Sequence, residues 1–288
     1  MKDFQYFRPK SIQEAFSLLD TYQNRARVLA GGTDLYLRME RKVLSPEYVI
    51  DLKKISELNY IVYDEKDGLR IGAMTLHRDL ARSRVIQEKF GILAKASAVV
   101  GSHQTRNRAT LGGNLCNASP AADTASALLA LGASVKIASS KGERVLSLED
   151  FFKGPGRTIL VPHEILLEIR VPSPLPRSGG SFQRHTRSAM DIAVVNVAAV
   201  LTLENQVCQD IKIGLSAVAP TPIRAFRAEG ILKGQPIREE LVRQAGQAAA
   251  EESRPISDVR SSAEYRRALV KALTERAIQE VREIADRS

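Results

Sequence analysis

Apolar side chains recur at helical spacing near the start of the 288-residue chain. Ser11 precedes this run and stands three residues before Glu14, which is the pattern of a capping box, so a helix over residues 12–19 is predicted. Short apolar runs at 27–30 and 48–52 predict two strands, with a helical pattern between them. The first block of the chain therefore combines helices with short strands.

A second block, ending near residue 171, combines hairpins with helices. Asp67-Gly68 joins two apolar runs and predicts a hairpin. Ser119 and Pro120 are the residue types of a helix cap and first turn, and Gly132 is that of a helix stop. The other predicted elements are strands at 60–63, 69–73, 133–138, 144–147 and 166–171, a helix at 92–100 and a loop at 101–119.

A run rich in proline, serine and glycine at 172–180 is typical of a linker. Beyond it, the apolar pattern predicts two long strands followed by two helices, the last of which begins in a capping box from Ser261 to Glu264. Strands followed by helices, without strict alternation, indicate an α+β domain. These elements span residues 192–203, 211–218, 238–251 and 263–284.

Composition restricts the class of protein. Hydrophobic residues make up 44% and charged residues 26% of the chain, which are values typical of globular proteins. No apolar run approaches the roughly 18 residues of a membrane span, and no secretory signal follows Met1. Two cysteines, Cys116 and Cys208, favour a reducing compartment over a disulfide framework, so we expect a cytoplasmic protein.

The net charge of +9 would suit nucleic acid, an acidic ligand or an acidic partner protein, and we favour a solvated basic surface with one or two anion sites. The basic residues form no block of five, and only 5% of residues are aromatic, with no Trp. A stacking platform for single-stranded nucleic acid is therefore not expected.

Several kinds of catalytic site are excluded by their missing motifs. The chain has no CxxC, no GxSxG and no Gly-Lys pair of a phosphate-binding P-loop. His163-Glu164 begins like a zinc-protease helix, but Leu167 stands where the second histidine would be. The four histidines are scattered, and two cysteines are too few for an iron–sulfur cluster. We expect no metal centre on this chain.

Two glycine-rich segments remain as candidate binding sites. Paired glycines let backbone N–H groups approach an anion closely, and a helix start beside each segment adds its positive dipole end. Two such segments suggest a pyrophosphate held between two lobes, as in a dinucleotide, although neither matches the GxGxxG of a Rossmann fold. The segments are residues 29–35 and 106–123.

Four motifs resemble the FAD-binding medium subunit of the xanthine dehydrogenase and carbon monoxide dehydrogenase family of molybdenum hydroxylases. They are AGGTDL at 30–35, RNRATLGGNLCNASPAAD at 106–123, HEILLEIRVP at 163–172 and RPISDVRSSAEYRR at 254–267. The resemblance implies a two-lobed FAD-binding domain of the vanillyl-alcohol-oxidase type over residues 1–175, with lobes at about 1–58 and 59–175. It also implies a smaller α+β domain over 181–286, with an antiparallel sheet and helices.

The resemblance further implies FAD-dependent electron transfer without a catalytic residue on this chain. The partners would be a small subunit with [2Fe–2S] clusters and a large subunit with the molybdenum cofactor, assembled as a dimer of heterotrimers. FAD would be held without a covalent bond, since the first loop has no histidine. The residues that the resemblance places at FAD are Leu29, Ala30, Gly31, Gly32, Thr33, Asp34, Leu35, Gly101, Thr110, Gly112, Gly113, Asn114, Asn117, Asp123, Leu166, Phe182 and Arg184.

Specific roles follow from the same resemblance. Residues 29–35 would wrap the pyrophosphate from one lobe, and Thr110 to Asn114 would close on it from the other. Asp123 would accept a hydrogen bond from the cofactor, and Gly101 would lie on its adenine side. Leu166, Phe182 and Arg184 would lie near the flavin ring, with Arg184 replacing the lysine of many members.

Simpler interpretations of single residues stay open. Asp123 would also suit a helix dipole alone, Cys116 would suit small-residue packing, and Arg184 would suit a surface charge. For the whole chain, two alternatives are a self-sufficient flavin oxidoreductase of the same superfamily and a non-enzymatic basic binding module.

Overall fold

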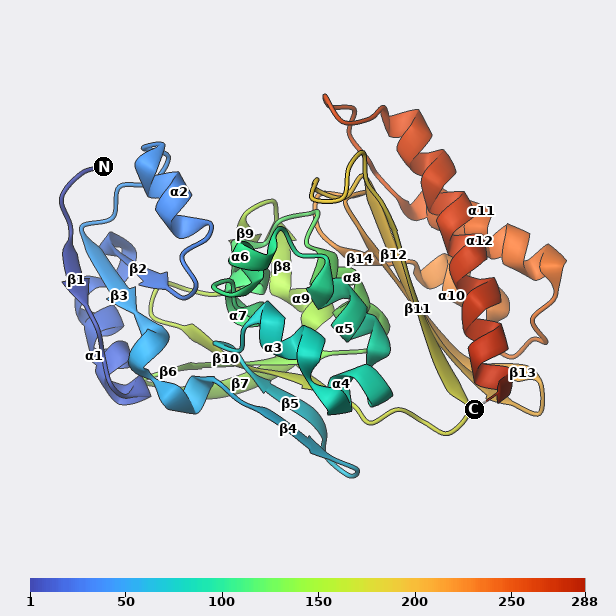
Figure 1. The fold of residues 1–288 in the computed structure, drawn as a ribbon, viewed down its shortest axis with the longest axis horizontal. Coiled ribbons are helices and arrows are strands. Elements are labelled where there is room, and N and C mark those ends of the chain that lie inside the picture. The colour runs from blue at the N-terminus through green and yellow to red at the C-terminus, as the bar shows by residue number, and fades with distance from the viewer. Residues whose placement is uncertain (288) are drawn as a thin grey trace.

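The computed structural model describes residues 1–287 as three side-by-side layers of structure, each with its own sheet (Figure 1). The N-terminal lobe has a parallel sheet in the order β1-β3-β2. Ser11 accepts a hydrogen bond from Glu14 N at 3.2 Å, which confirms the predicted cap, while the Glu14 carboxylate reaches back to Lys10 N. The elements are β1 (Gln5–Phe7), α1 (Ile12–Tyr22), β2 (Ala26–Leu29), α2 (Leu35–Glu40) and β3 (Tyr48–Asp51).

The central lobe contains a five-stranded antiparallel sheet in the order β4-β5-β10-β6-β7. Its strands are β4 (Ile61–Asp64), β5 (Gly68–Gly72), β6 (Ser134–Ser139), β7 (Gly142–Ser147) and β10 (Ile165–Val171), and a separate small pair is β8 (Phe152–Gly154) and β9 (Arg157–Thr158). Its helices are α3 (His77–Arg82), α4 (Arg84–Lys89), α5 (Gly91–Ala98), α6 (His103–Arg106), α7 (Leu111–Asn117), α8 (Asp123–Ala130) and α9 (Leu148–Phe151).

The C-terminal part is a four-stranded antiparallel sheet covered on one face by α11 and α12 (Figure 1). Helix α8 of the central lobe packs against β12 and β13 of the same sheet. Gly214 shows how close this approach is, because a Cβ atom there would lie 2.2 Å from the Ser126 carbonyl oxygen. The elements are β11 (Ser178–His185), β12 (Val195–Glu204), β13 (Val207–Ser216), β14 (Ile223–Arg224), α10 (Phe226–Leu232), α11 (Glu239–Glu252) and α12 (Ala263–Arg287).

The segment predicted as a loop at 101–119 contains two short helices instead. Ser102 caps α6, and Thr110 caps α7 by accepting a hydrogen bond from Gly113 N at 3.0 Å. The helix predicted to begin at Pro120 begins only at Asp123, because residues 119–122 form a turn closed by a backbone hydrogen bond. Two adjacent glycines hid α7 from a propensity-based prediction.

In the C-terminal part, two predicted element starts differ from the structure. Strand β11 already begins inside the expected linker, and Gly179 lets helix α12 cross it, since a Cβ there would lie 2.7 Å from the Val281 carbonyl oxygen. Helix α12 receives its cap from Ser262, whose hydroxyl accepts a hydrogen bond from Tyr265 N, and not from Ser261. No helix within residues 1–287 is long and apolar enough to cross a bilayer.

Replacing Gly214 by alanine should lower the free energy of unfolding by about 1–3 kcal/mol, because the added methyl group would push α8 off the C-terminal sheet. The matched control is Gly230→Ala in α10, where no atom lies within 4 Å of the new Cβ and the change removes a weak helix former. Urea denaturation of both variants tests this prediction, and equal stabilities would contradict it.

Candidate functional site

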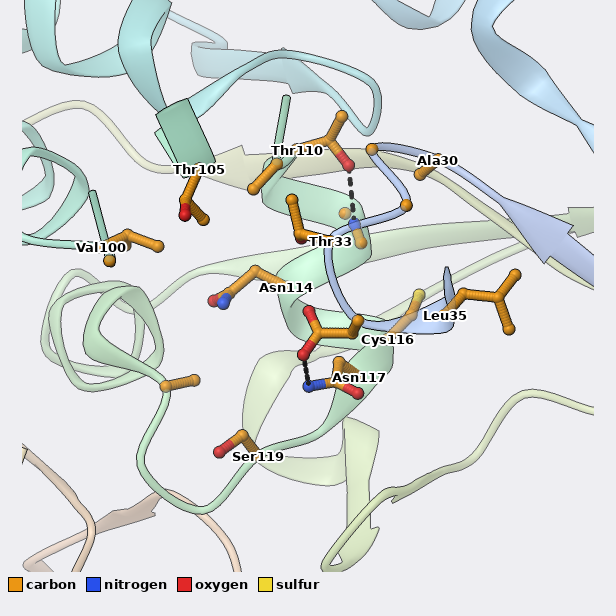
Figure 2. A pocket seen from close by; sticks show the side chains of 18 of the residues that line it. Ala30, Thr33, Leu35, Val100, Thr105, Thr110, Asn114, Cys116, Asn117 and Ser119 are labelled. Carbon is orange, nitrogen blue, oxygen red and sulfur yellow. Dashed lines mark hydrogen bonds between the residues drawn. The ribbon is translucent and has the colours of Figure 1, made fainter. Parts of the chain in front are cut away.

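A cavity of about 640 Å³ opens between the two lobes and reaches the C-terminal sheet. In Figure 2, Ala30, Thr33 and Leu35 come from the first glycine-rich segment, and Thr110, Asn114 and Asn117 come from the second. All of the sequence-predicted residues line the cavity except Leu29 and Phe182. The lining members are Ala30, Gly31, Gly32, Thr33, Asp34, Leu35, Gly101, Thr110, Gly112, Gly113, Asn114, Asn117, Asp123, Leu166 and Arg184.

The first glycine-rich loop offers unused backbone donors to this cavity. Within the described chain, none of the amide N–H groups of residues 31–34 donates a hydrogen bond to another protein group. Gly32 has a φ of +83°, a left-handed conformation that lets successive amides turn toward one side. Free amides in a row, just before a helix start, are the donors that an anionic phosphate group requires.

The side chain of Lys53 contacts the start of this loop, and no sequence motif indicated it. Its Nζ donates to the Ala30 carbonyl at 3.2 Å and lies 2.7 Å from Oδ1 of Asp51. Asp51 is fully buried and also accepts a hydrogen bond from the Tyr6 hydroxyl, and these donors hold the pKa of its carboxyl below the ordinary value despite burial. The ammonium group therefore has a fixed position beside the loop.

The two glycine-rich segments touch each other directly. A Cβ atom on Gly31 would lie only 2.1 Å from the Arg108 carbonyl oxygen, so only glycine allows this approach. Asn117 Nδ2 donates to Oδ1 of Asp34 at 3.1 Å across the same junction. This bond is the dashed line that ends at Asn117 in Figure 2. Desolvation by the surrounding protein raises the pKa of Asp34.

The second segment does not offer the free amides that its glycine pair suggested. The amide N–H groups of Leu111 and Gly112 donate to the carbonyls of Thr75 and Ala73, and that of Gly113 donates to its helix cap. Gly112 serves packing, since a Cβ there would lie 2.6 Å from the Ala73 Cβ. The first loop therefore supplies a row of four free amides, whereas the amides of residues 111–113 are used within the central lobe.

Side chains on α7 supply other polar contacts. Asn114 Oδ1 accepts a hydrogen bond from Thr124 Oγ1 at 2.8 Å, which fixes the amide and leaves Nδ2 without a protein partner in the described chain. Asn114 points into the cavity in Figure 2. The sulfur of Cys116 also faces this region, and desolvation raises the pKa of its thiol to about 12.

An ion pair connects the cavity wall to the C-terminal sheet. Arg184 Nε donates to Oδ1 of Asp123 at 2.8 Å, and Asn196 Nδ2 donates to the same oxygen at 2.9 Å. Burial raises the pKa of Asp123, with Arg184 opposing the rise. Asp123 is therefore more than a partner of its own helix dipole, and Arg184 is not a free surface charge. The second carboxylate oxygen, Oδ2, has no protein partner among the described residues.

Phe182, which the resemblance placed near the flavin ring, does not line the cavity. It packs against an apolar cluster between the central lobe and the C-terminal sheet, which includes Ile92 and Ala127, because alternate residues of β11 face this cluster. Leu29 lies beneath the first loop, with its Cδ1 3.3 Å from the Cβ position of Gly32. Arg106 of the second segment does not line this cavity, and its Nη1 donates to the Val100 and Gly101 carbonyls.

The lining also includes residues that the sequence motifs did not indicate. They come from α2, from the turn before α6, from α6 itself and from the loop after β11, and no short motif marks these segments. They include Arg38, Val100, Thr105, Met190 and Asp191. Among residues 1–287 no group of three potential metal ligands gathers.

Two family models match nearly the whole chain. Residues 2–174 match the FAD binding domain in molybdopterin dehydrogenase, and residues 180–281 match the CO dehydrogenase flavoprotein C-terminal domain. The chain belongs to this family of molybdopterin dehydrogenase flavoproteins.

Individual relatives agree over almost their full length. The chain is 35% identical to the glyceraldehyde dehydrogenase medium chain of Sulfolobus acidocaldarius over 279 residues, covering 97% of this chain and 98% of the relative. It is 33% identical to the carbon monoxide dehydrogenase medium chain of Hydrogenophaga pseudoflava, covering 96% of each.

The fold is also shared with solved structures of such enzymes. The carbon monoxide dehydrogenase of Hydrogenophaga pseudoflava has a chain that superposes with a TM-score of 0.94 at 33% identity, covering 97% of both chains. Quinoline 2-oxidoreductase of Pseudomonas putida 86 gives a TM-score of 0.92 at 34% identity, covering 99% of both. The two-part α+β fold predicted from the sequence is thereby confirmed.

The cavity suits the family's FAD in size and in donor set. A volume of about 640 Å³ falls within the roughly 300–1,000 Å³ typical of ligand and cofactor pockets. The free amides of residues 31–34 match the charge of a pyrophosphate, and Arg38 and Lys53 stand beside them. Apolar wall is supplied by Leu166 and Ile165 of β10.

We expect FAD to be bound without a covalent link. No histidine lines the cavity within the described chain, and the raised pKa of Cys116 keeps its thiol protonated and unreactive at neutral pH. Acid precipitation of the purified protein should leave the yellow colour in the supernatant. Colour retained in the pellet would contradict this expectation.

Gly113→Val should weaken FAD binding by at least about tenfold, corresponding to about 1.4 kcal/mol. The new Cβ would lie 2.8 Å from the Thr110 hydroxyl that caps α7 and 3.4 Å from the Ala30 Cβ, so the branched side chain would separate the two loops. The control is Gly91→Val at the start of α5, where the space is open. Flavin absorbance per protein reports the occupancy, and circular dichroism checks the fold. Full occupancy in the Gly113 variant would show that this junction is not needed.

Proposed function

We propose that this chain is the FAD-carrying electron-transfer subunit of a multi-subunit molybdenum hydroxylase. It would pass electrons between the [2Fe–2S] clusters of a partner subunit and an external acceptor. The observation that carries the proposal is the row of free amides at residues 31–34, in a loop that lines a cavity between two lobes. Two family models together match nearly the whole chain around it. This context favours the subunit interpretation over a self-sufficient flavin enzyme and over a basic binding module.

The protein's task at this site is binding and positioning. When bound, FAD supplies the redox chemistry by taking up electrons singly and releasing them in pairs. In the proposed arrangement, residues 31–34 donate to the pyrophosphate, and Asn114 Nδ2 and Asp123 Oδ2 make polar contacts with other parts of the cofactor. Leu166 contributes apolar wall. Arg184 would place a positive charge near the flavin, held there by its bond to Asp123.

The partners would be a small subunit with [2Fe–2S] clusters and a large subunit with the molybdenum cofactor, in a dimer of heterotrimers. The names of the relatives support this assembly, because they are medium chains of dehydrogenases. A division into an FAD-binding domain at 1–175 and a C-terminal domain at 181–286 is supported by the ranges of the two family matches. The complex is proposed to be cytoplasmic, which suits the two free cysteines.

The isolated chain should not oxidise an organic substrate. Its flavin should be bleached by dithionite, but it should stay oxidised when mixed with purines, nicotinate, aldehydes or carbon monoxide, because the molybdenum site lies on another subunit. Anaerobic absorbance spectra measure both reactions. Co-expression with the two partner subunits is the positive control and should restore turnover. Bleaching of the isolated chain by an organic substrate at the rate of turnover would support a self-sufficient flavin enzyme instead.

A further inference from the structure

A second hollow, of about 260 Å³, lies between helices α3, α5 and α6 of the central lobe. Four basic side chains from two of these helices line it together with Asn107, and two alanines complete the wall. No carboxylate is among the lining residues in the described chain. The basic residues are Arg78, Arg82, His103 and Arg106.

Most of the donors around this hollow have no acceptor on the protein. The side chains of Arg82, His103 and Asn107 make no hydrogen bond or ion pair within the described chain. Arg78 uses only Nε, which lies 2.9 Å from Oδ1 of Asp79. Arg106 uses Nη1 for two backbone carbonyls at 3.0 Å and keeps Nη2 available. A group of guanidinium donors without acceptors favours an anion, and planar guanidinium groups suit phosphate oxygens well.

The buried neighbour His77 responds to the same positive field. It is fully buried, and neither ring nitrogen has a hydrogen-bond partner in the described chain. Burial, and to a smaller extent the charge of Arg106, lower the pKa of His77 to about 4. His77 is therefore neutral at physiological pH, and it adds no further positive charge to this region.

We propose that this hollow is a binding site for a phosphate-type oxyanion, separate from the FAD cavity. Its volume is below the roughly 300–1,000 Å³ of pockets that enclose drug-sized ligands, so it suits a phosphate group and not a whole dinucleotide. The anion would be either free phosphate or the phosphate of a small phosphorylated metabolite. The site goes beyond the proposed electron-transfer function and does not depend on it.

Helix α6 forms a wall between the two cavities and couples them. Thr105 lines the FAD cavity, whereas His103 and Arg106 line the hollow. Arg106 holds the carbonyls of Val100 and Gly101, and Gly101 lines the FAD cavity in a left-handed conformation with φ +49°. An anion on the free side of Arg106 would hold this wall in place. Phosphate should therefore strengthen the equilibrium binding of FAD, and by linkage FAD should strengthen phosphate binding by the same factor.

The test is calorimetric titration of the FAD-loaded full chain with inorganic phosphate and, separately, with AMP, at constant ionic strength maintained by chloride. Wild-type protein should bind one phosphate-type anion per chain in a saturable way. Arg82→Gln and Arg78→Gln should each weaken binding by at least about tenfold, since each removes a charged donor. The matched control is Arg243→Gln, which removes the same charge from an exposed i,i+4 pair on α11.

Comparing the affinities of phosphate and AMP shows whether the site takes the free ion or a phosphorylated metabolite. Tighter binding of phosphate assigns the site to the free ion, and tighter binding of AMP assigns it to a phosphorylated metabolite. The proposal is overturned if neither ligand saturates, or if Arg243→Gln weakens binding as much as Arg82→Gln does. Flavin absorbance and circular dichroism of each variant confirm that the chain is folded, and Arg82, being exposed, provides the variant least coupled to folding.

Discussion

The cofactor cavity depends on one backbone contact between the two lobes. Gly31 lies so close to the Arg108–Ala109 backbone that a single added carbon would overlap it. This contact places the free amides of the first loop opposite α7, and the hydrogen bond between Asn117 and Asp34 closes the same junction. Without it the free amides of residues 31–34 would no longer lie against the central lobe, and water would satisfy them.

The two lobes divide the work of binding unequally. The first loop ends a parallel strand and has amides that no protein group satisfies, and Lys53 fixes the carbonyl at its entrance. In the second segment, the amides of residues 111–113 donate within the central lobe, and α7 presents side chains such as Asn114 to the cavity. The N-terminal lobe therefore offers donors for a negatively charged group, and the central lobe offers side chains for polar contacts in defined positions.

The C-terminal sheet takes part in the site through buried polar bonds. Asp123 starts α8 of the central lobe, yet the two side chains that donate hydrogen bonds to its carboxylate, Arg184 and Asn196, lie on β11 and β12. A buried carboxylate with its partner removed is costly, which makes the relative position of the sheet and the cavity well defined. Close packing at Gly214 has the same effect further along α8.

Local sequence determined the elements whose signals are local: the Ser11 cap, the Asp67-Gly68 hairpin, the Gly132 stop at φ +67°, and the two glycine-rich segments beside the cavity. The family motifs added FAD and the two-part fold. Tertiary structure alone decided that Gly112 serves packing, that Phe182 faces the domain interface, and that Lys53 reaches Ala30. These outcomes depend on which distant backbone meets each residue, and a short stretch of sequence does not encode that meeting.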